Sequence, residues 1–218
     1  MAKNDTLSRI LETGIVPVVR AASGEEALGV IDAIKAGGID VIELTMTVPG
    51  AVEVIRELAR RYGESVVLGA GTVLDAETAR ACMLAGARFV VSPIVDLPTI
   101  ACCRTYSVPV MPGALTPTEI VAAWRAGAAL VKVFPCGAMG GASYVTSLKA
   151  PFPHIDLIPT GGVSLATVAD FIHAGASALG AGADLVDLKK LRSGDAAAIT
   201  EKAKQYLQAI RQARVDAA

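Results

Sequence analysis

Lys132 is the residue of this sequence best suited to covalent chemistry. It stands in the apolar run Leu-Val-Lys-Val-Phe at residues 130–134. Burial in such a run disfavours the ammonium form of a lysine, so we expect some free amine near neutral pH. A free amine condenses with the ketone of a 2-keto acid to give a protonated Schiff base, which stabilises negative charge on the adjacent carbon. Lys132 is therefore the first candidate for a catalytic residue.

Glu43 is the matching candidate for proton transfer. It lies in the run Val-Ile-Glu-Leu-Thr at residues 41–45. A carboxyl group held in an apolar setting can move protons as a general acid and base. The structural alternative is that Lys132 and Glu43 form a buried ion pair. Because desolvation offsets most of the attraction in such a pair, we favour catalysis, although the two interpretations are compatible.

The alternation of side chains along a strand predicts which residues share the interior with Lys132. If Lys132 points inward, Phe134 does too, and the same parity turns Glu43 and Arg20 inward on their own strands. These groups fall toward the C-terminal ends of the predicted strands, where parallel α/β enzymes place their chemistry. The remaining polar residues at such ends are Thr72, Ser92 and Thr160.

Arg20 and two neighbouring strand ends suggest how a substrate carboxylate would be held. The guanidinium of Arg20 can offer a planar fork to a carboxylate, although pairing with a nearby acid of the protein is an equally good interpretation. Thr72, in the segment Gly-Ala-Gly-Thr-Val at 69–73, and Pro93 are expected to line the floor of the pocket. Glycines in such a segment let the backbone approach a ligand closely.

Two glycine-rich segments near the C-terminus predict a phosphate site. The segment 160–164, Thr-Gly-Gly-Val-Ser, leads from a strand toward a helix, and Gly182 closes the last predicted strand. Barrel proteins bind phosphate on backbone N–H groups after their seventh and eighth strands. Tight turns that need glycine for shape alone are the alternative. Ala183 and Asp184 follow, and they supply no hydroxyl and add a negative charge.

Eight short apolar runs must position these residues. Amphipathic stretches of about a dozen residues separate them, a pattern typical of βα units and a parallel sheet. One example is the stretch 24–36, which carries a regular apolar face. The runs are residues 15–20, 41–45, 66–70, 89–92, 108–111, 130–134, 156–159 and 178–182.

A weak internal repeat supports the same organisation. The triplets Ala-Gly-Gly at 36–38 and Ala-Gly-Ala at 85–87, 126–128 and 174–176 each close a predicted helix just before a predicted strand, and glycine suits the left-handed position that ends a helix. We predict a single compact (β/α)8 TIM barrel over 1–218, with an N-terminal helical cap at about 1–13 and a C-terminal helix at about 195–214. An open doubly wound sheet is the alternative, but no glycine-rich fingerprint follows the first run.

Composition excludes several classes of partner. The 20 basic and 21 acidic residues nearly cancel and form no long block, so we expect neither nucleic acid nor a membrane surface as a partner. No run is long enough to span a bilayer, and the start has no signal-peptide pattern, which predicts a cytoplasmic protein. The four cysteines show no CxxC spacing, and we expect reduced thiols, no metal and no cofactor.

The ordered motifs give the chain a family resemblance. Glu43, the Val-Lys-Val-Phe-Pro segment at 131–135, Gly-Ala-Gly-Thr-Val at 69–73, Val-Ser-Pro at 91–93 and Pro-Thr-Gly-Gly at 159–162 occur together. In this respect the chain resembles the 2-keto-3-deoxy-6-phosphogluconate aldolase family, which also covers 4-hydroxy-2-oxoglutarate and phosphogalactonate aldolases. The resemblance runs over about residues 7 to 210.

The resemblance implies a class I aldolase that needs no metal and assembles as a homotrimer. Lys132 would form the Schiff base with a 2-keto acid, and Glu43 would be the general acid and base. The substrate-binding residues implied are Arg20, Thr47, Thr72, Pro93, Phe134, Thr160, Gly161, Gly162, Gly182 and Ala183. The chain departs from the family pattern at Thr47, where many members have arginine, and at Ala183, where a serine often contacts phosphate.

These departures keep several functions open. The first expectation is cleavage of 2-keto-3-deoxy-6-phosphogluconate to pyruvate and glyceraldehyde 3-phosphate. The second is an aldolase for 4-hydroxy-2-oxoglutarate or for an unphosphorylated 2-keto-3-deoxy sugar acid. An isomerase or epimerase that binds phosphate without a covalent intermediate, and an assembly subunit without catalysis, are alternatives of other classes.

Overall fold

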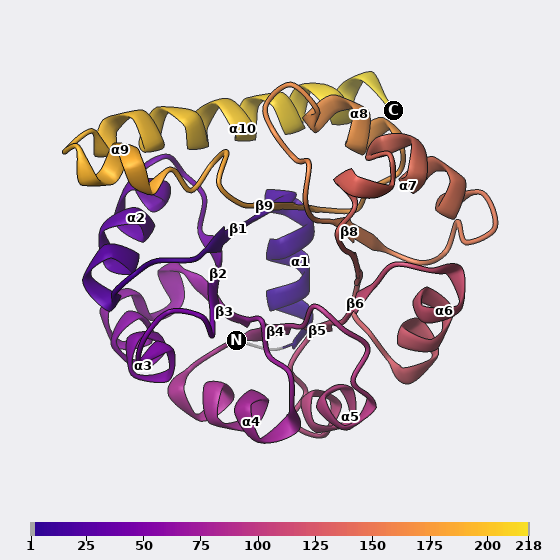
Figure 1. The fold of residues 1–218 in the computed structure, drawn as a ribbon, viewed down its shortest axis with the longest axis horizontal. Coiled ribbons are helices and arrows are strands. Elements are labelled where there is room, and N and C mark those ends of the chain that lie inside the picture. Colours follow the sequence, from indigo (N-terminus) through magenta and orange to yellow (C-terminus); the bar gives the residue numbers. More distant parts are fainter. Residues whose placement is uncertain (1–2, 218) are drawn as a thin grey trace.

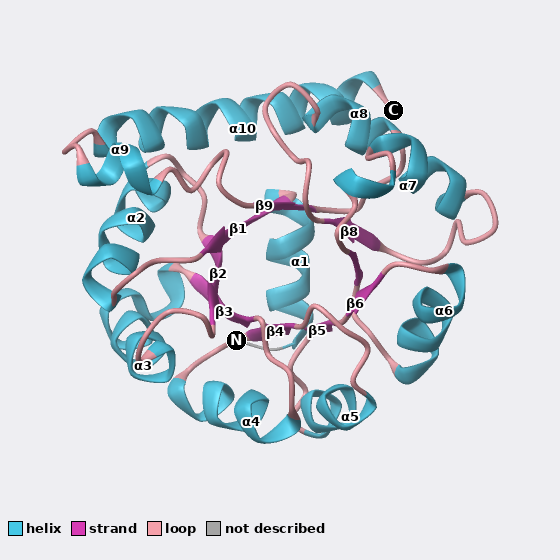
Figure 2. Ribbon diagram, viewed as in Figure 1, coloured by secondary structure: helices cyan, strands magenta, loops and turns pink. Residues whose placement is uncertain are grey.

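Parallel strands alternate with helices along residues 3–217, the part of the chain that the computed structural model describes. Figure 2 shows the strands gathered around the centre of the molecule, with most of the helices outside them. The strands are β1 Ile15–Val19, β2 Val41–Thr45, β3 Val67–Gly71, β4 Phe89–Val91, β5 Val110–Met111, β6 Gly113–Ala114, β7 Val131–Val133, β8 Leu157–Pro159 and β9 Leu179–Ala181.

The helices follow the predicted order. They are α1 Lys3–Thr13, α2 Gly24–Ala36, α3 Ala51–Tyr62, α4 Ala76–Ala85, α5 Leu97–Thr105, α6 Pro117–Ala126, α7 Ala142–Lys149, α8 Val168–His173, α9 Leu188–Arg192 and α10 Ala196–Asp216, with 3-10 turns at Gly63–Ser65 and Gly137–Met139. Helix α2 has the bounds expected from its apolar face, and the Ser23 side chain caps it by accepting from the Glu26 N–H. No helix within the described range is both long and apolar enough to cross a bilayer.

Every strand pairing in the described chain is parallel. One sheet has the order β5-β4-β3-β2-β1-β9, and a second has the order β6-β7-β8. A single bridge between Thr160 and Gly180 links the end of β8 to β9. In Figure 1 the two sheets face each other around α1. The prediction of an α/β fold with parallel strands is therefore confirmed.

The predicted strand at 108–111 differs from the structure. Only Val110 and Met111 of this range form a strand, β5, and a further short strand, β6, follows after Pro112. β5 pairs with β4 and β6 pairs with β7, so the chain changes its neighbour at the proline. Proline has no N–H to donate to a sheet, which accounts for the interruption. The fifth of the eight predicted runs therefore corresponds to a strand that the proline interrupts.

Two separate apolar clusters show which way the strand residues point. An inner cluster takes residues from strands all around the molecule, together with Ile10 of α1; its strand and strand-end members are Val16, Val41, Val67, Phe89, Val91, Met111, Leu130, Ile158 and Ala178. An outer cluster contains their neighbours, such as Ile15 and Ile42, packed against the helices. This alternation agrees with the predicted parity, in which Leu130 and Lys132 share the inner face.

The two terminal helices occupy different places. Helix α1 packs on the inner cluster through Ile10, which is fully buried. Helix α10 lies along one side of the molecule beside α2 and α8 (Figure 1). The predicted cap at about 1–13 and helix at about 195–214 fall on these two elements, except for residues 1–2, which lie outside the described residues, as does residue 218 of the predicted domain.

Candidate active site

Lys132 lies in the middle of β7 with only 3% of its surface exposed. Its backbone neighbours across the sheet are Gly113 of β6 and Ile158 of β8. The ammonium nitrogen Nζ is 5.1 Å from the centre of the Phe134 ring. Among the described residues, no carboxylate forms an ion pair with it. Lys132 is thus a buried amine in contact with an aromatic ring and with no acidic partner.

Glu43 lies on β2 and is 2% exposed. Its oxygen Oε1 is the one buried side-chain polar atom of the described chain that has no hydrogen-bond partner. The carboxylate lies over Gly71 of β3, because a β-carbon built on Gly71 would lie 1.8 Å from Oε1. A buried acceptor without a partner is costly, and native proteins keep one where a function requires it. This oxygen is available to a reacting group.

Lys132 and Glu43 come from strands in different sheets. β2 is in the larger sheet and β7 in the smaller one. The view down the molecule places β2 opposite β6 and β8, the two strands that flank β7 (Figure 1). No ion pair joins Lys132 and Glu43 within the described chain. The structural alternative, in which these two residues form a buried ion pair, therefore does not hold.

Thr72 follows β3 in a conformation that a threonine rarely adopts. Its φ is 60°, in the left-handed region. For a β-branched residue this is a genuine outlier, with a typical cost of about 1–3 kcal/mol. Such strain collects at ligand-binding positions. Thr72 stands directly after Gly71, the residue that makes room for Glu43, so the strained turn lies at the edge of the candidate site.

Thr47 and Arg20 lie at the exposed end of the same region. The Thr47 hydroxyl is 2.6 Å from that of Thr45, which also donates to the carbonyl of Val19 at 3.1 Å. This arrangement ties the end of β2 to β1. Arg20, just beyond β1, is exposed, and no acid among residues 3–217 forms an ion pair or a hydrogen bond with it. Its Nη1 lies near Gly182, at 3.9 Å from the position of a built β-carbon.

Pro93 and Phe134 lie at the ends of β4 and β7, and both are half-buried. The backbone of Pro93 packs on Gly113, where a β-carbon would come within 2.3 Å of the Pro93 carbonyl carbon. Gly113 is therefore required for this close approach. Ser92, which sequence parity also turns inward, is buried, and its hydroxyl accepts the N–H of Ile94 at 3.2 Å.

Gly161 and Gly162 form a left-handed turn after β8, with φ values of 91° and 80°. The Gly161 carbonyl accepts the Gly137 N–H at 3.0 Å. Thr160, just before them, is buried with its hydroxyl against Gly180. A cavity of about 590 Å³, which we call the glycine cavity, opens beside the turn. Its lining includes Gly137, Gly140, Gly141, Ser143, Gly162 and Asp170.

Asp184 does not add a negative charge to this site. Its carboxylate accepts from the Lys202 ammonium at 3.1 Å and from the Tyr206 hydroxyl, both on α10. Burial raises the pKa of Asp184, but these hydrogen bonds and the charge of Lys202 outweigh it and hold the pKa below its ordinary value. The concern raised by Asp184 in the sequence therefore falls away. Ala183, beside it, is exposed.

Ala183 instead lines a second cavity, of about 430 Å³, between the end of β1 and α9. Arg20 lines it too, together with Lys189 and Arg192. We call it the α9 cavity. Sequence reasoning did not single out Lys189 and Arg192, because a short basic segment is usually a solvated surface. The signal available was their spacing of three residues, which places two cations on one side of a helix.

The cysteines and potential metal ligands stand apart from this chemistry. All four cysteines are free, and three are buried. No cluster of three or more His, Cys, Asp or Glu side chains suited to a metal ion occurs within residues 3–217. The candidate functional groups are the Lys132 amine, the Glu43 carboxylate, the Arg20 guanidinium and several hydroxyl and backbone N–H groups.

The fold and the site together define a class of protein: an α/β enzyme with a buried lysine and a buried carboxylate inside parallel sheets. The chain belongs to the KDPG and KHG aldolase family, whose pattern it matches over residues 7–202. The resemblance predicted from the sequence is confirmed. Members of this family are named aldolases, which are lyases.

Individual relatives support the same assignment. The 2-dehydro-3-deoxy-phosphogluconate aldolase of Treponema pallidum (strain Nichols) is 34% identical over 197 residues, which cover 90% of this chain and 93% of the relative. The KDPG aldolase of Legionella pneumophila, solved with pyruvate captured as a covalent carbinolamine, has a TM-score of 0.84 at 26% identity, covering 91% and 96% of the two chains. A cube-shaped cage designed by fusing symmetric oligomeric domains has a TM-score of 0.83 at 29% identity, covering 93% of this chain and 74% of the cage chain.

Proposed function

We propose that this protein is a class I aldolase that cleaves a 4-hydroxy-2-keto acid to pyruvate and an aldehyde. The observation that carries the proposal is the pair of unpartnered groups in one interior. Lys132 is a buried amine with no acid bound to it, and Glu43 is a buried carboxylate with an oxygen that bonds to nothing. Two such groups are poor contributors to stability, whereas together they supply what imine chemistry needs.

The reaction begins at the Lys132 amine. Its lone pair attacks C2 of the substrate ketone to form a carbinolamine, and loss of water gives a protonated Schiff base. Glu43, with its free Oε1, then takes the proton of the C4 hydroxyl. The C3–C4 bond breaks, its electrons move into the imine to form an enamine, and the aldehyde leaves. Glu43 returns the proton to C3, and water releases pyruvate and restores the amine.

The other residues hold the substrate. Arg20 and Thr72 bind the C1 carboxylate, since both lie at the C-terminal end of their strands and Arg20 has no protein acid to neutralise it. Pro93, Phe134 and Thr160 shape the pyruvyl pocket. Thr47 occupies the position at which many members of the family carry arginine, so Arg20 supplies much of the positive field. Gly161 and Gly162, in the left-handed turn after β8, offer backbone N–H groups to the distal end of the substrate.

The preferred substrate is 2-keto-3-deoxy-6-phosphogluconate, with glyceraldehyde 3-phosphate as the aldehyde product. One observation favours a second candidate. The glycine cavity contains the carboxylate of Asp170 and no cationic side chain, and Ala183 beside Gly182 offers no hydroxyl. On this basis 4-hydroxy-2-oxoglutarate or an unphosphorylated 2-keto-3-deoxy sugar acid is the alternative substrate of the same reaction.

The assembly and architecture follow from the same family membership. We propose that the two sheets together form one closed (β/α)8 barrel. In it β5 and β6 count as one interrupted strand, and the Thr160–Gly180 bridge joins β8 to β9. The chain then works as a single domain. A homotrimer is the proposed assembly, supported by the similarity to the designed cage of symmetric oligomers. The cytoplasmic location stays a prediction.

Trapping with borohydride tests the mechanism. The protein is incubated with pyruvate and reduced, and the expected result is a mass gain on the peptide that contains Lys132. The exposed Lys204, on α10, is the control lysine and should stay unmodified. Lys132→Arg, which keeps the charge but not the nucleophile, should abolish both trapping and cleavage.

Glu43→Gln separates the two roles. The variant should cleave substrate about 10²–10⁴-fold more slowly, which is the usual contribution of a general acid and base. An unmodified Lys132 in the native protein would exclude the aldolase and favour an isomerase or epimerase without a covalent intermediate. Full cleavage activity in Glu43→Gln would remove Glu43 from the mechanism.

A further inference from the structure

The α9 cavity adjoins the strand β1, next to the strand that carries Glu43. Val18, which lines the cavity, is also the direct parallel-strand partner of Glu43. Val18 is 2% exposed, so the cavity reaches down to the buried layer of β1. Arg20 and Ala183 form its border on the side of Gly182. A substrate bound to Lys132 and Glu43 therefore has this cavity beside it.

The cavity has an excess of positive charge. Arg20, Lys189 and Arg192 contribute three cations to its lining, and Asp187 contributes one carboxylate. Asp187 is already engaged, because its Oδ1 accepts the backbone N–H groups of Lys189 and Lys190 at 3.0 and 3.1 Å. The Lys189 ammonium has no ion pair or hydrogen bond within the described chain. An exposed cation beside a cavity and without a protein partner attracts an anionic ligand.

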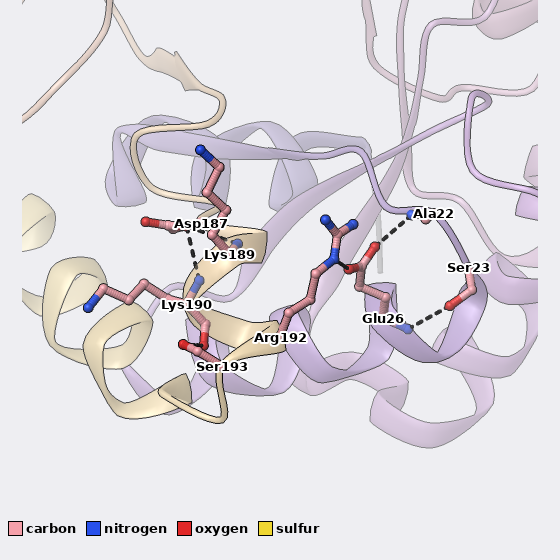
Figure 3. Close-up of polar contacts among 8 residues, drawn as sticks. All are labelled: Ala22, Ser23, Glu26, Asp187, Lys189, Lys190, Arg192 and Ser193. Carbon is pink, nitrogen blue, oxygen red and sulfur yellow. Dashed lines mark hydrogen bonds and ion pairs between the residues drawn. The ribbon is translucent and has the colours of Figure 1, made fainter.

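Figure 3 shows that the basic side chains of α9 point in different directions. The side chains of Lys189 and Arg192 rise from one side of the helix, whereas Lys190 extends away from them. Lys190 pairs with Asp195 at 3.1 Å and lines a different cavity, against α10. Two adjacent lysines thus have different environments. Of these two lysines, Lys189 lines the α9 cavity together with Arg20, and Lys190 does not.

Arg192 is held in place rather than free. Its Nε donates to Oε1 of Glu26 at 2.5 Å, and Oε2 of Glu26 accepts the Ala22 N–H at 2.7 Å. This connection joins α9 to the loop that follows Arg20 (Figure 3). Because Nε makes the pair, the two terminal nitrogens of the guanidinium remain available to a ligand. The α9 cavity therefore has a fixed wall.

We infer that Lys189 is a specificity-determining residue, which binds the anionic distal group of the substrate in the α9 cavity with the support of Arg192. The inference rests on the proposed function and deepens it, because it names a residue that would select substrates by their distal anionic group. The glycine cavity offers backbone N–H groups, the hydroxyls of Ser143 and Thr167 and the carboxylate of Asp170, but no cation, whereas the α9 cavity has cations. Lys189 thus supplies the positive charge that the backbone N–H groups of Gly161 and Gly162 lack. The shared ligand chemistry is a phosphate or a carboxylate at the end remote from C2.

The test compares three substrates with Lys189→Gln and its matched control Lys190→Gln. The substrates are 2-keto-3-deoxy-6-phosphogluconate, 4-hydroxy-2-oxoglutarate and neutral-ended 2-keto-3-deoxygluconate. Loss of a charged hydrogen bond raises KM by about tenfold or more. We expect Lys189→Gln to show this increase for an anionic-ended substrate, with kcat unchanged and with KM for the neutral-ended substrate unchanged. The substrate that is affected identifies the source of the anion, phosphate or carboxylate.

Other outcomes overturn the inference. An equal change for the neutral-ended substrate, an equal change in Lys190→Gln, or no change in any KM would each show that Lys189 does not read the distal group. Borohydride trapping of pyruvate on Lys132 is measured in the same variants. If trapping fails in the native protein, the proposed aldolase is wrong; if it succeeds in all variants without a selective KM effect, only the role of Lys189 is wrong.

Discussion

The carboxylate of Glu43 occupies the space that a side chain at Gly71 would fill. A β-carbon built on Gly71 would lie 1.8 Å from Oε1 and 2.3 Å from Cδ of Glu43. Glycine at 71 is thus a condition for the position of the acid on the neighbouring strand. The glycine at this position of the Gly-Ala-Gly-Thr-Val motif is therefore explained by the space that the Glu43 carboxylate needs.

Gly71→Ala tests this relationship. The added methyl group should push the Glu43 carboxylate away from its position and lower kcat/KM by about 10²-fold, because small displacements of a catalytic group have effects of this size. Steady-state cleavage assays give the value. Gly29→Ala on α2 is the control, since a β-carbon there meets Leu191 at an ordinary 3.4 Å and alanine suits a helix. An active Gly71→Ala protein would show that Glu43 has room to move.

Lys132→Met should not weaken the fold. Removal of a buried amine without an acidic partner ends its desolvation cost, so we expect the free energy of unfolding to rise by about 1 kcal/mol. Urea denaturation measures the change. Lys149 provides the contrast, because its ammonium donates to the carbonyls of Pro153 and Ile155 at 2.9 and 3.0 Å, and Lys149→Met should lower stability. A marked loss of stability in Lys132→Met would mean that the amine serves the fold.

The Glu26 link between α9 and the β1 loop should be sensitive to acid. The hydrogen bond from Arg192, followed by that from the Ala22 N–H, holds the pKa of Glu26 below its ordinary value. The stabilisation is therefore complete above the pKa of Glu26 in the unfolded chain and is lost as the pH falls through its lower pKa in the folded protein. Urea denaturation at a series of pH values should show a deficit for Glu26→Gln at neutral pH that shrinks in acid. Glu57→Gln, at an exposed position on α3, should show no such trend.

The cysteines should differ in reactivity. Burial raises the pKa of the Cys103 thiol to about 12 and of the Cys82 and Cys136 thiols to about 11. Little thiolate is then present at pH 8, so these residues should alkylate slowly in the folded protein. Cys102 is only half-buried and should react first. Mass spectrometry should detect one rapid modification in the native state and four after unfolding; rapid modification of Cys103 would contradict its burial.

Much of the fold could be predicted because one residue fixed the direction of many others. Once Lys132 was placed inward, alternation along the strands placed Glu43 in the same interior, and the inner apolar cluster agrees with that parity. The turns before β4, β7 and β9 confirm the predicted left-handed glycines, with φ of 115° at Gly86, 101° at Gly127 and 91° at Gly175. In the first repeat, which has two glycines, Gly38 is the left-handed one, with φ of 97°, whereas Gly37 has a φ of −80°.

Other features depend on contacts that no local pattern encodes. At Pro112 the chain stops pairing with β4 and starts pairing with β7. This change depends on where those two distant strands lie, which the local sequence does not show. The sequence predicts that Asp184 adds a negative charge near the phosphate turn. In the structure its carboxylate instead accepts hydrogen bonds from Lys202 and Tyr206 of α10, about 20 residues further along the chain. The contrast between Lys189 and Lys190 likewise arises only once α9 is set against the rest of the molecule.

Helix α1 has a consequence for the order of events in a catalytic cycle. Ile10 packs among residues at the N-terminal ends of several strands, such as Val41 and Leu130, and closes that end of the interior. Substrate therefore enters and products leave at the open end, where the strands have their C-terminal ends. With pyruvate joined to Lys132, as proposed above, the aldehyde is the fragment nearer the open end and would leave first. We therefore expect ordered release, with the aldehyde first and pyruvate last, and product-inhibition patterns to match that sequence.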